Sequence, residues 1–298
     1  MFEHIIGNDN IKQNLEDAIK LNKIAHSYLF IGIKGIGKKM IAKDFAKKIL
    51  CLNENKYCNN CKSCIRFETN NNPDFSIIEP DGNSIKIEQI REMQRKIQEK
   101  PIISTQKIYL IDDADCMTKE AQNCLLKTLE EPPKFAKIIL IGSNEQDFLS
   151  TIKSRCIILH FNKISDKLIK EYLEKQYGMK NINQDILDMF QGSIGKAIQL
   201  KQKIDKYQEI SRIIDDVEKK DIIEILNEAE IIYNSKEEIF DILDYINVIL
   251  LKKAKINYKY VYCMEIIEQT KKRLRQNANY NMSIDNMLFN IWEKAIED

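Results

Sequence analysis

The sequence predicts an α/β domain with a parallel sheet, followed by an all-α region. Over residues 1–160, short apolar segments alternate with amphipathic helices, which is typical of a parallel sheet covered by helices on both faces. Strand-like segments stop after residue 160, and residues 208–298 contain neither Gly nor Pro, as expected for uninterrupted helices. We therefore expect three parts: an α/β domain over 1–160, a small helical domain over 161–207 and a C-terminal helical domain over 208–298.

The individual elements follow from the spacing of apolar residues. Ile11, Leu15 and Ile19 recur every fourth position and predict a first helix. Further helices are predicted over 38–50, 87–97 and 121–129, and Pro132-Pro133 stops the last of them. Five apolar runs are short enough to be strands: 27–31, 75–79, 107–111, 137–141 and 156–160. Because these runs are apolar throughout rather than alternating, we expect strands buried on both faces.

Composition limits the classes of function. Hydrophobic residues make up 44% and charged residues 31% of the 298 residues, so the chain can form real cores and is not expected to be disordered. The net charge of +1 argues against a free-standing duplex-DNA binder, which usually has a strong basic excess. No run approaches the roughly 18 apolar residues of a membrane span, and the first residues lack the pattern of a secretory signal. We therefore expect a cytoplasmic protein.

A glycine-rich segment between the first strand and the second helix has the setting of a phosphate-binding loop. Gly32, Gly35, Gly37 and Lys38 match its pattern, in which backbone N–H groups surround the phosphates and the lysine reaches the β- and γ-phosphates. The next position normally holds Ser or Thr, whose hydroxyl binds Mg²⁺, but here it is Lys39. The segment is thus either a vestigial strand-to-helix turn or a degenerate site with residual nucleotide binding.

A second nucleotide-related pattern follows the strand over 107–111. An apolar strand followed by Asp112 matches the Walker-B pattern, whose first Asp holds Mg²⁺. Hydrolysing proteins usually continue with Glu, which polarises the attacking water, whereas this chain has Asp113. The shorter side chain moves the carboxylate by roughly 1.5 Å, and a misplacement of about 1 Å can cost on the order of 100-fold in rate. Two independent elements therefore point away from hydrolysis.

Four of the eight cysteines form a cluster, which comprises Cys51, Cys58, Cys61 and Cys64. In a reducing compartment such a cluster indicates a metal site rather than disulfides. Four thiolates at this spacing suit tetrahedral Zn²⁺ in a closed, structural site. A [4Fe–4S] cluster is one alternative, but its bacterial pattern continues with a further Cys and Pro that are absent here. Free thiols are the other.

Three further segments are distinctive in their order and spacing. They are residues 25–30 (AHSYLF), 123–133 (NCLLKTLEEPP) and 154–156 (SRC). Together with the phosphate loop and the cysteine cluster, they resemble the AAA+ subunits of the bacterial sliding-clamp loader of DNA polymerase III over about residues 1–200. The resemblance implies an AAA+ module with a small zinc-binding insertion at 51–64 and a helical lid. It also implies that the C-terminal helices form the collar through which subunits assemble.

That family contains ATP-hydrolysing motor subunits and a non-hydrolysing one, and three departures favour the second. Lys39 replaces the hydroxyl residue, Asp113 replaces the Walker-B Glu, and Gly195 stands where motors carry an Arg that senses the γ-phosphate. The resemblance thus implies an accessory subunit, a stator, without ATPase activity of its own. Its partners would be motor subunits and a delta-type subunit in a hetero-pentamer, and it would reach the sliding clamp and primer–template DNA through that complex. No membrane partner is expected.

The resemblance also implies that Arg155, in the SRC segment, is an arginine finger that reaches the γ-phosphate of ATP held by a neighbouring subunit. A guanidinium binds phosphate bidentately and can accelerate phosphoryl transfer. Asn144 lies near the family's sensor-1 position, where we expect it to cap the end of a strand. Two alternatives stay open: a motor subunit that hydrolyses ATP with an atypical loop, and a zinc-dependent DNA-binding module.

Overall fold

The computed structural model describes residues 2–53, 58–179 and 182–296, in which the chain forms two compact units. The first unit comprises the residues up to Leu168 and the short segment Ser193–Gly195, and the second comprises Ile169–Gly192 and the residues from Lys196 onward. These units do not separate 161–207 from 208–298, so the three-part division of the chain stays a prediction. Within the described residues, no helix is both long and apolar enough to span a membrane.

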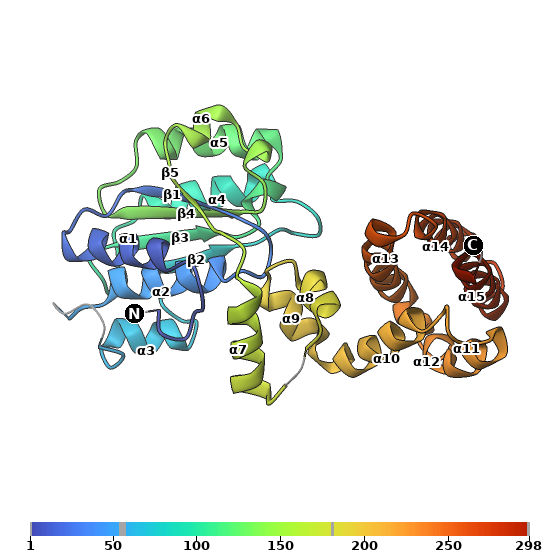
Figure 1. The fold of residues 1–298 in the computed structure, drawn as a ribbon. Helices are drawn as coiled ribbons and strands as arrows, with labels where there is room; N and C mark the ends of the chain where they lie inside the picture. Colours follow the sequence, from blue (N-terminus) through green and yellow to red (C-terminus); the bar gives the residue numbers. More distant parts are fainter. Residues whose placement is uncertain (1, 54–57, 180–181, 297–298) are drawn as a thin grey trace. The chain divides into compact units, whose positions relative to one another are not determined.

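The first unit is built on a parallel sheet (Figure 1). Its five strands are β1 (Ser27–Ile31), β2 (Phe75–Ile78), β3 (Lys107–Ile111), β4 (Ala136–Gly142) and β5 (Ile157–His160). They lie in the order β2-β3-β4-β1-β5, and all neighbouring pairs are parallel. The predicted strands are confirmed, with ends that differ by one residue at most. Because the strands are parallel, their carboxyl ends meet at one edge, where ligands bind in open α/β sheets.

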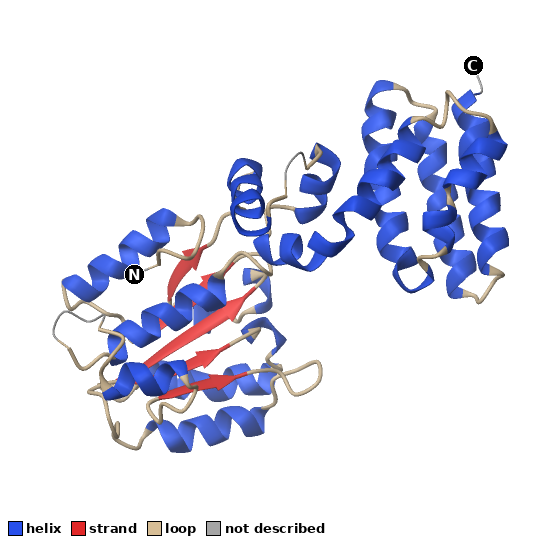
Figure 2. Ribbon diagram, turned by 90° about the horizontal axis from the view of Figure 1, so that it is seen from below, coloured by secondary structure: helices blue, strands red, loops and turns tan. Residues whose placement is uncertain are grey.

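Helices cover both faces of this sheet (Figure 2). One apolar core is shared with α1 (Asp9–Lys20), α2 (Lys38–Leu50) and α3 (Lys62–Glu68). The other is shared with α4 (Ile87–Ile97), α5 (Lys119–Glu130) and α6 (Ser150–Lys153). On β1, Phe30 belongs to the first core and Leu29 to the second, because successive side chains of a strand point to opposite faces. Burial on both faces explains the continuous apolar runs in the sequence.

The second unit is helical in its described part, which confirms the predicted change after residue 160. Its short helices are α7 (Asp166–Tyr177), whose first turn belongs to the first unit, α8 (Gln184–Phe190), α9 (Ile194–Leu200), α10 (Ile204–Asp215), α11 (Ile222–Glu228) and α12 (Glu230–Tyr233). Three longer helices pack in sequence order: α13 (Ile239–Ile256), α14 (Tyr260–Arg275) and α15 (Tyr280–Ile296). The buried rings of Tyr207 and Tyr245 meet edge to face, with centroids 4.8 Å apart, and join α10 to α13.

Candidate functional site

The phosphate-loop segment connects β1 to α2 within the first unit. Gly35 and Gly37 have left-handed backbone conformations, with φ of 79° and 94°, which side chains rarely allow. Gly37 directly precedes the first turn of α2. The glycines therefore occur where the backbone turns sharply, as a phosphate loop requires at a helix N-terminus.

The loop lysine is turned toward the loop itself. The Nζ of Lys38 donates hydrogen bonds to the carbonyl oxygens of Gly32 and Ile33, the second at 2.9 Å. Lys38 is only 7% exposed, and burial lowers the pKa of its amine. Backbone oxygens thus satisfy the ammonium group that would otherwise bind phosphate.

Lys39 is the residue that sets this loop apart. Its Nζ lies 2.7 Å from Oδ2 of Asp112, at the end of β3, and 2.5 Å from Oε1 of Glu79, at the end of the neighbouring β2. Burial lowers the pKa of Lys39, but the hydrogen bonds to Asp112 and Glu79 outweigh it, so the pKa lies above its usual value. The residues therefore do not fit Mg²⁺: the hydroxyl ligand is missing, and the Walker-B carboxylate already pairs with an ammonium group.

The second acid after β3 is also paired with a lysine of the loop. Asp113 has a left-handed backbone, with φ of 45°, and its Oδ2 accepts a hydrogen bond of 2.9 Å from Nζ of Lys34. This hydrogen bond raises the pKa of Lys34. Both carboxylates that follow β3 are thus neutralised from within the chain, a feature that neither sequence pattern predicted.

The turn Ser193–Gly195 packs directly on the loop and belongs to the same compact unit. The backbone N–H of Gly195 donates to the carbonyl oxygen of Gly35 at 2.8 Å, and Oγ of Ser193 donates to the carbonyl oxygen of Lys34 at 2.9 Å. A Cβ atom at residue 195 would lie 2.7 Å from Cα of Gly35, closer than side chains are found. The position therefore requires glycine, and a longer side chain such as arginine does not fit this arrangement.

Arg155 lies between α6 and β5, at the surface of the first unit. Its Nη1 donates to the carbonyl oxygen of Thr151 at 2.9 Å and to Oγ of Ser154 at 3.2 Å. Its Nη2 lies 2.7 Å from Oε1 of Glu130, the last residue of α5. The Arg155 side chain is 33% exposed, so the guanidinium is held by its own subunit but stays accessible to another molecule.

Asn144 follows β4 and caps the short 3₁₀ turn Glu145–Asp147. Its Oδ1 accepts a hydrogen bond of 3.1 Å from the backbone N–H of Gln146. Asn144 thus acts as a cap, but of the 3₁₀ turn that follows β4 rather than of the strand end itself. This contact lies within its own turn and does not join Asn144 to the loop.

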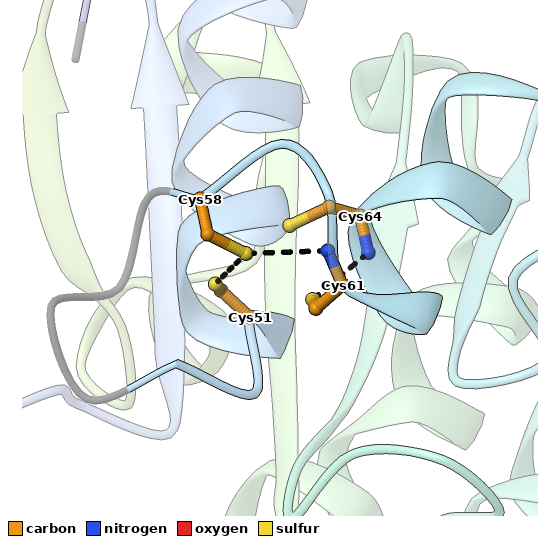
Figure 3. Close-up of side chains that lie close together, drawn as sticks. All are labelled: Cys51, Cys58, Cys61 and Cys64. Atoms are coloured by element: carbon orange, nitrogen blue, oxygen red, sulfur yellow. Dashed lines mark hydrogen bonds between the residues drawn. The ribbon is translucent and has the colours of Figure 1, made fainter.

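The four clustered cysteines converge between the end of α2 and the start of α3 (Figure 3). Their sulfur atoms all lie within 4.8 Å of one another, and the sulfurs of Cys51 and Cys58 are 3.5 Å apart. Tetrahedral Zn²⁺ with bonds of about 2.3 Å places sulfur atoms roughly 3.8 Å apart. The donor set and its spacing therefore fit a zinc ion, and all eight cysteines of the chain are free thiols. The part of the predicted module over 54–57 lies outside the described residues.

Backbone N–H groups point at two of these sulfurs, as they do around thiolates. The N–H of Cys61 donates to Sγ of Cys58, and the N–H of Cys64 donates to Sγ of Cys61, each at 3.4 Å. Burial raises the pKa of Cys61, but hydrogen bonds from the backbone of Leu52 and Cys64 outweigh it and lower the pKa to about 6. Burial raises the pKa of Cys51 and Cys64. A bound cation would favour the thiolate form of all four.

Comparison with known proteins places these features in a family. The family model described as "DNA polymerase III, delta subunit" matches residues 7–165. Subunit delta' of DNA polymerase III from Bacillus subtilis is 35% identical over 201 residues, which cover 67% of this chain and 61% of that protein. Subunit tau/gamma from Haemophilus influenzae is 35% identical over 184 residues, which cover 61% of this chain and 26% of that protein. The matches thus span less than two thirds of either relative.

A solved structure supports the fold over nearly the whole chain. It is a DNA polymerase III gamma subunit-related protein from Thermotoga maritima, with a TM-score of 0.51 and 17% identity over 94% of this chain and 99% of that one. An identity this low shows the fold alone. Together with the parallel sheet and the helical region that follows, it confirms the predicted fold, an α/β module with helices on both faces of the sheet and a C-terminal helical region.

Proposed function

Because the chain belongs to the DNA polymerase III delta subunit family of clamp-loader proteins, we propose that it is the non-hydrolysing, delta-prime-type subunit. In this proposal the chain does not turn over ATP itself. It supplies Arg155 as a finger to ATP in a neighbouring motor subunit while the complex loads the sliding clamp onto DNA. The observation that carries the proposal is the pairing of Lys39 with Asp112 at 2.7 Å.

The physical argument against turnover is electrostatic. Mg²⁺ and the ammonium group of Lys39 compete for the Asp112 carboxylate. Because Lys39 is covalently attached next to that carboxylate, its positive charge repels the divalent cation. Lys38 donates to loop carbonyls, and Gly195 rests on Gly35. The first two contacts use groups that a hydrolysing site needs for metal and phosphate, and the third leaves no room for a phosphate-sensing side chain at residue 195.

The alternative is an ATP-hydrolysing motor, and it has a specific basis. Gamma/tau subunits are among the similar proteins, at the same 35% identity as subunit delta'. A motor with this loop would need to release Lys39 from two carboxylates and move the Ser193–Gly195 turn before Mg-nucleotide could enter. We therefore rank the non-hydrolysing function first.

Arg155 supports the finger assignment through its position. It is exposed at the surface, and its guanidinium can bind phosphate bidentately once a neighbour presents one. The partners we propose are motor subunits and a delta-type subunit in a hetero-pentamer, joined through the helices of 208–298. Contact with the sliding clamp and primer–template DNA comes through that complex, in the cytoplasm.

Zinc completes the proposal as a structural cofactor. Cys51, Cys58, Cys61 and Cys64 supply four sulfur ligands and leave no open position, so the ion would hold the segment between α2 and α3 rather than take part in chemistry.

The finger assignment is tested in the reconstituted complex. Arg155→Ala should lower the ATPase rate at the one motor site that Arg155 faces by about 10³-fold or more, because a trans guanidinium stabilises the transition-state charge, and the rate of the whole complex should fall by at least the share of that site. Arg95→Ala, on the exposed side of α4, is the matched control and should leave the rate unchanged. An unchanged rate with Arg155→Ala would remove the assignment.

The non-hydrolysing function is tested on the isolated chain. Titration calorimetry with ATPγS, with and without Mg²⁺, should show no saturable binding, and an ATPase assay should show no turnover. Mg-dependent binding accompanied by hydrolysis would favour the motor alternative.

A further inference from the structure

Glu130 ends α5 inside the distinctive 123–133 segment, and no role has been assigned to it so far. Its carboxylate forms the ion pair with Nη2 of Arg155, while Nη1 of the same guanidinium donates to Thr151 and Ser154. The adjacent Glu131 is exposed, and among the described residues it forms no ion pair. Of these two neighbouring acids of equal charge, Glu130 therefore contacts the proposed finger and Glu131 does not.

A buried amide joins α5, which carries Glu130, to the segment that leads into α6, which Arg155 follows. Gln122 of α5 is 3% exposed, and its Nε2 donates to the carbonyl oxygen of Asp147 at 2.9 Å. Its Oε1 accepts from the backbone N–H of Leu149, directly before α6, also at 2.9 Å. These hydrogen bonds join α5 to the segment before α6, so the backbones near Glu130 and Arg155 are linked by a buried contact as well as by the ion pair.

A carboxylate and a phosphate compete for the same guanidinium donors. The planar carboxylate and the tetrahedral phosphate both accept hydrogen bonds from the Nη atoms of arginine. Because both are negatively charged, they repel each other when they approach the same guanidinium. We propose that Glu130 is a positioning residue that holds Arg155 in the subunit without a partner and is exchanged for the γ-phosphate when a neighbour docks. This inference rests on the proposed finger function of Arg155.

The strength of the pair suits an exchange. Both side chains are partly exposed, at 33% for Arg155 and 48% for Glu130, so solvent weakens their attraction. Exposed ion pairs typically change an equilibrium by about two- to fivefold. While Glu130 holds the guanidinium, only the fraction of molecules with a free Arg155 can bind phosphate, and the apparent affinity falls in proportion to that fraction. Removing the carboxylate should therefore strengthen nucleotide-dependent docking by the same factor, about two- to fivefold.

The experiment measures the affinity of the full chain for a gamma/tau-type motor subunit, with ATPγS and without nucleotide. Glu130→Gln should tighten binding about two- to fivefold with ATPγS and leave binding without nucleotide unchanged. Glu130→Ala should act in the same direction, and Glu131→Gln, the matched control, should bind like the parent chain in both states. A purely structural role of Glu130 would instead alter both states together and lower the melting temperature.

Two further variants separate failure of this inference from failure of the finger function. Arg155→Ala should abolish the gain in affinity that ATPγS brings, and Arg155→Ala combined with Glu130→Gln should behave like Arg155→Ala alone. If Arg155→Ala abolishes the gain but Glu130→Gln binds like Glu131→Gln or more weakly, the exchange is refuted and the finger stands. If Arg155→Ala leaves the gain intact, the finger itself is refuted, and the exchange with it.

Discussion

Replacing Lys39 by Thr should create a magnesium-responsive protein. The change removes the ammonium group that pairs with Glu79 and Asp112, and it restores the hydroxyl that phosphate loops use as a metal ligand. Asp112, which is only 18% exposed, then lies near Glu79 and Asp113 without its cation. The variant should therefore be less stable than the parent chain when no divalent ion is present and should regain stability when one binds.

The magnitude follows from exposure and mass action. Lys39 is 38% exposed and Glu79 is 57% exposed, so solvent partly screens the attraction in the ion pairs that Lys39 forms with Glu79 and with Asp112. Together they should contribute about 1–2 kcal/mol to the free energy of unfolding. If the variant binds Mg²⁺ with a dissociation constant of about 1 mM, then 10 mM Mg²⁺ restores about 1.4 kcal/mol. For a domain of this size that corresponds to a rise in melting temperature of about 3–6 °C.

The assay is thermal unfolding followed by circular dichroism, with MgCl₂ against NaCl at equal ionic strength. Buffers should be free of chelators, which would also remove zinc. Lys39→Arg is the matched control, because it keeps a cation and should not respond to Mg²⁺. Our reasoning is refuted if Mg²⁺ stabilises Lys39→Thr no more than it stabilises the parent chain.

Two other variants test separate parts of the first unit. Gly195→Ala should lower the free energy of unfolding by about 1–3 kcal/mol, because its Cβ would lie 2.7 Å from Cα of Gly35; Lys196→Ala should change it by less than about 0.5 kcal/mol. Chemical denaturation measures both, and equal stabilities would contradict the close packing of the turn. Elemental analysis of protein purified without added metal should give about one zinc per chain, because four thiolates form a closed site. Cys64→Ser should lower this content and Cys124→Ser should not; metal-free parent protein of undiminished stability would contradict the site.

Local sequence patterns were sufficient for the fold and for the cysteine cluster. Burial on both faces leaves continuous apolar runs, so strands such as 107–111 were predictable from the residues themselves. Likewise, Cys58, Cys61 and Cys64 are brought together by short spacing and one helix start, which needs no knowledge of distant contacts.

The pairings that define the loop were not predictable in the same way. Glu79 and Asp112 pair with the same Lys39 because β2 and β3, which they follow, are neighbours in the sheet, and sequence order alone does not give that neighbourhood. The sequence marks Gly195 only as the replacement of an arginine that the resemblance implies, whereas the packing of Gly195 on Gly35 joins residues far apart in the chain. A weaker signal existed for Glu79: it follows a predicted strand, and parallel strands bring their carboxyl ends to one edge.

The cation beside Asp112 is part of the polypeptide, so its presence at this carboxylate does not depend on the concentration of a free ion. A free ion occupies a site according to its concentration, but a group on a short tether acts at an effective concentration on the order of millimolar or higher that dilution cannot change. Lys39 therefore neutralises Asp112 and Glu79 without any metal or nucleotide being supplied. The charge of this loop is thus set by the sequence, whereas the charge of a loop that binds a free ion changes with the concentration of that ion.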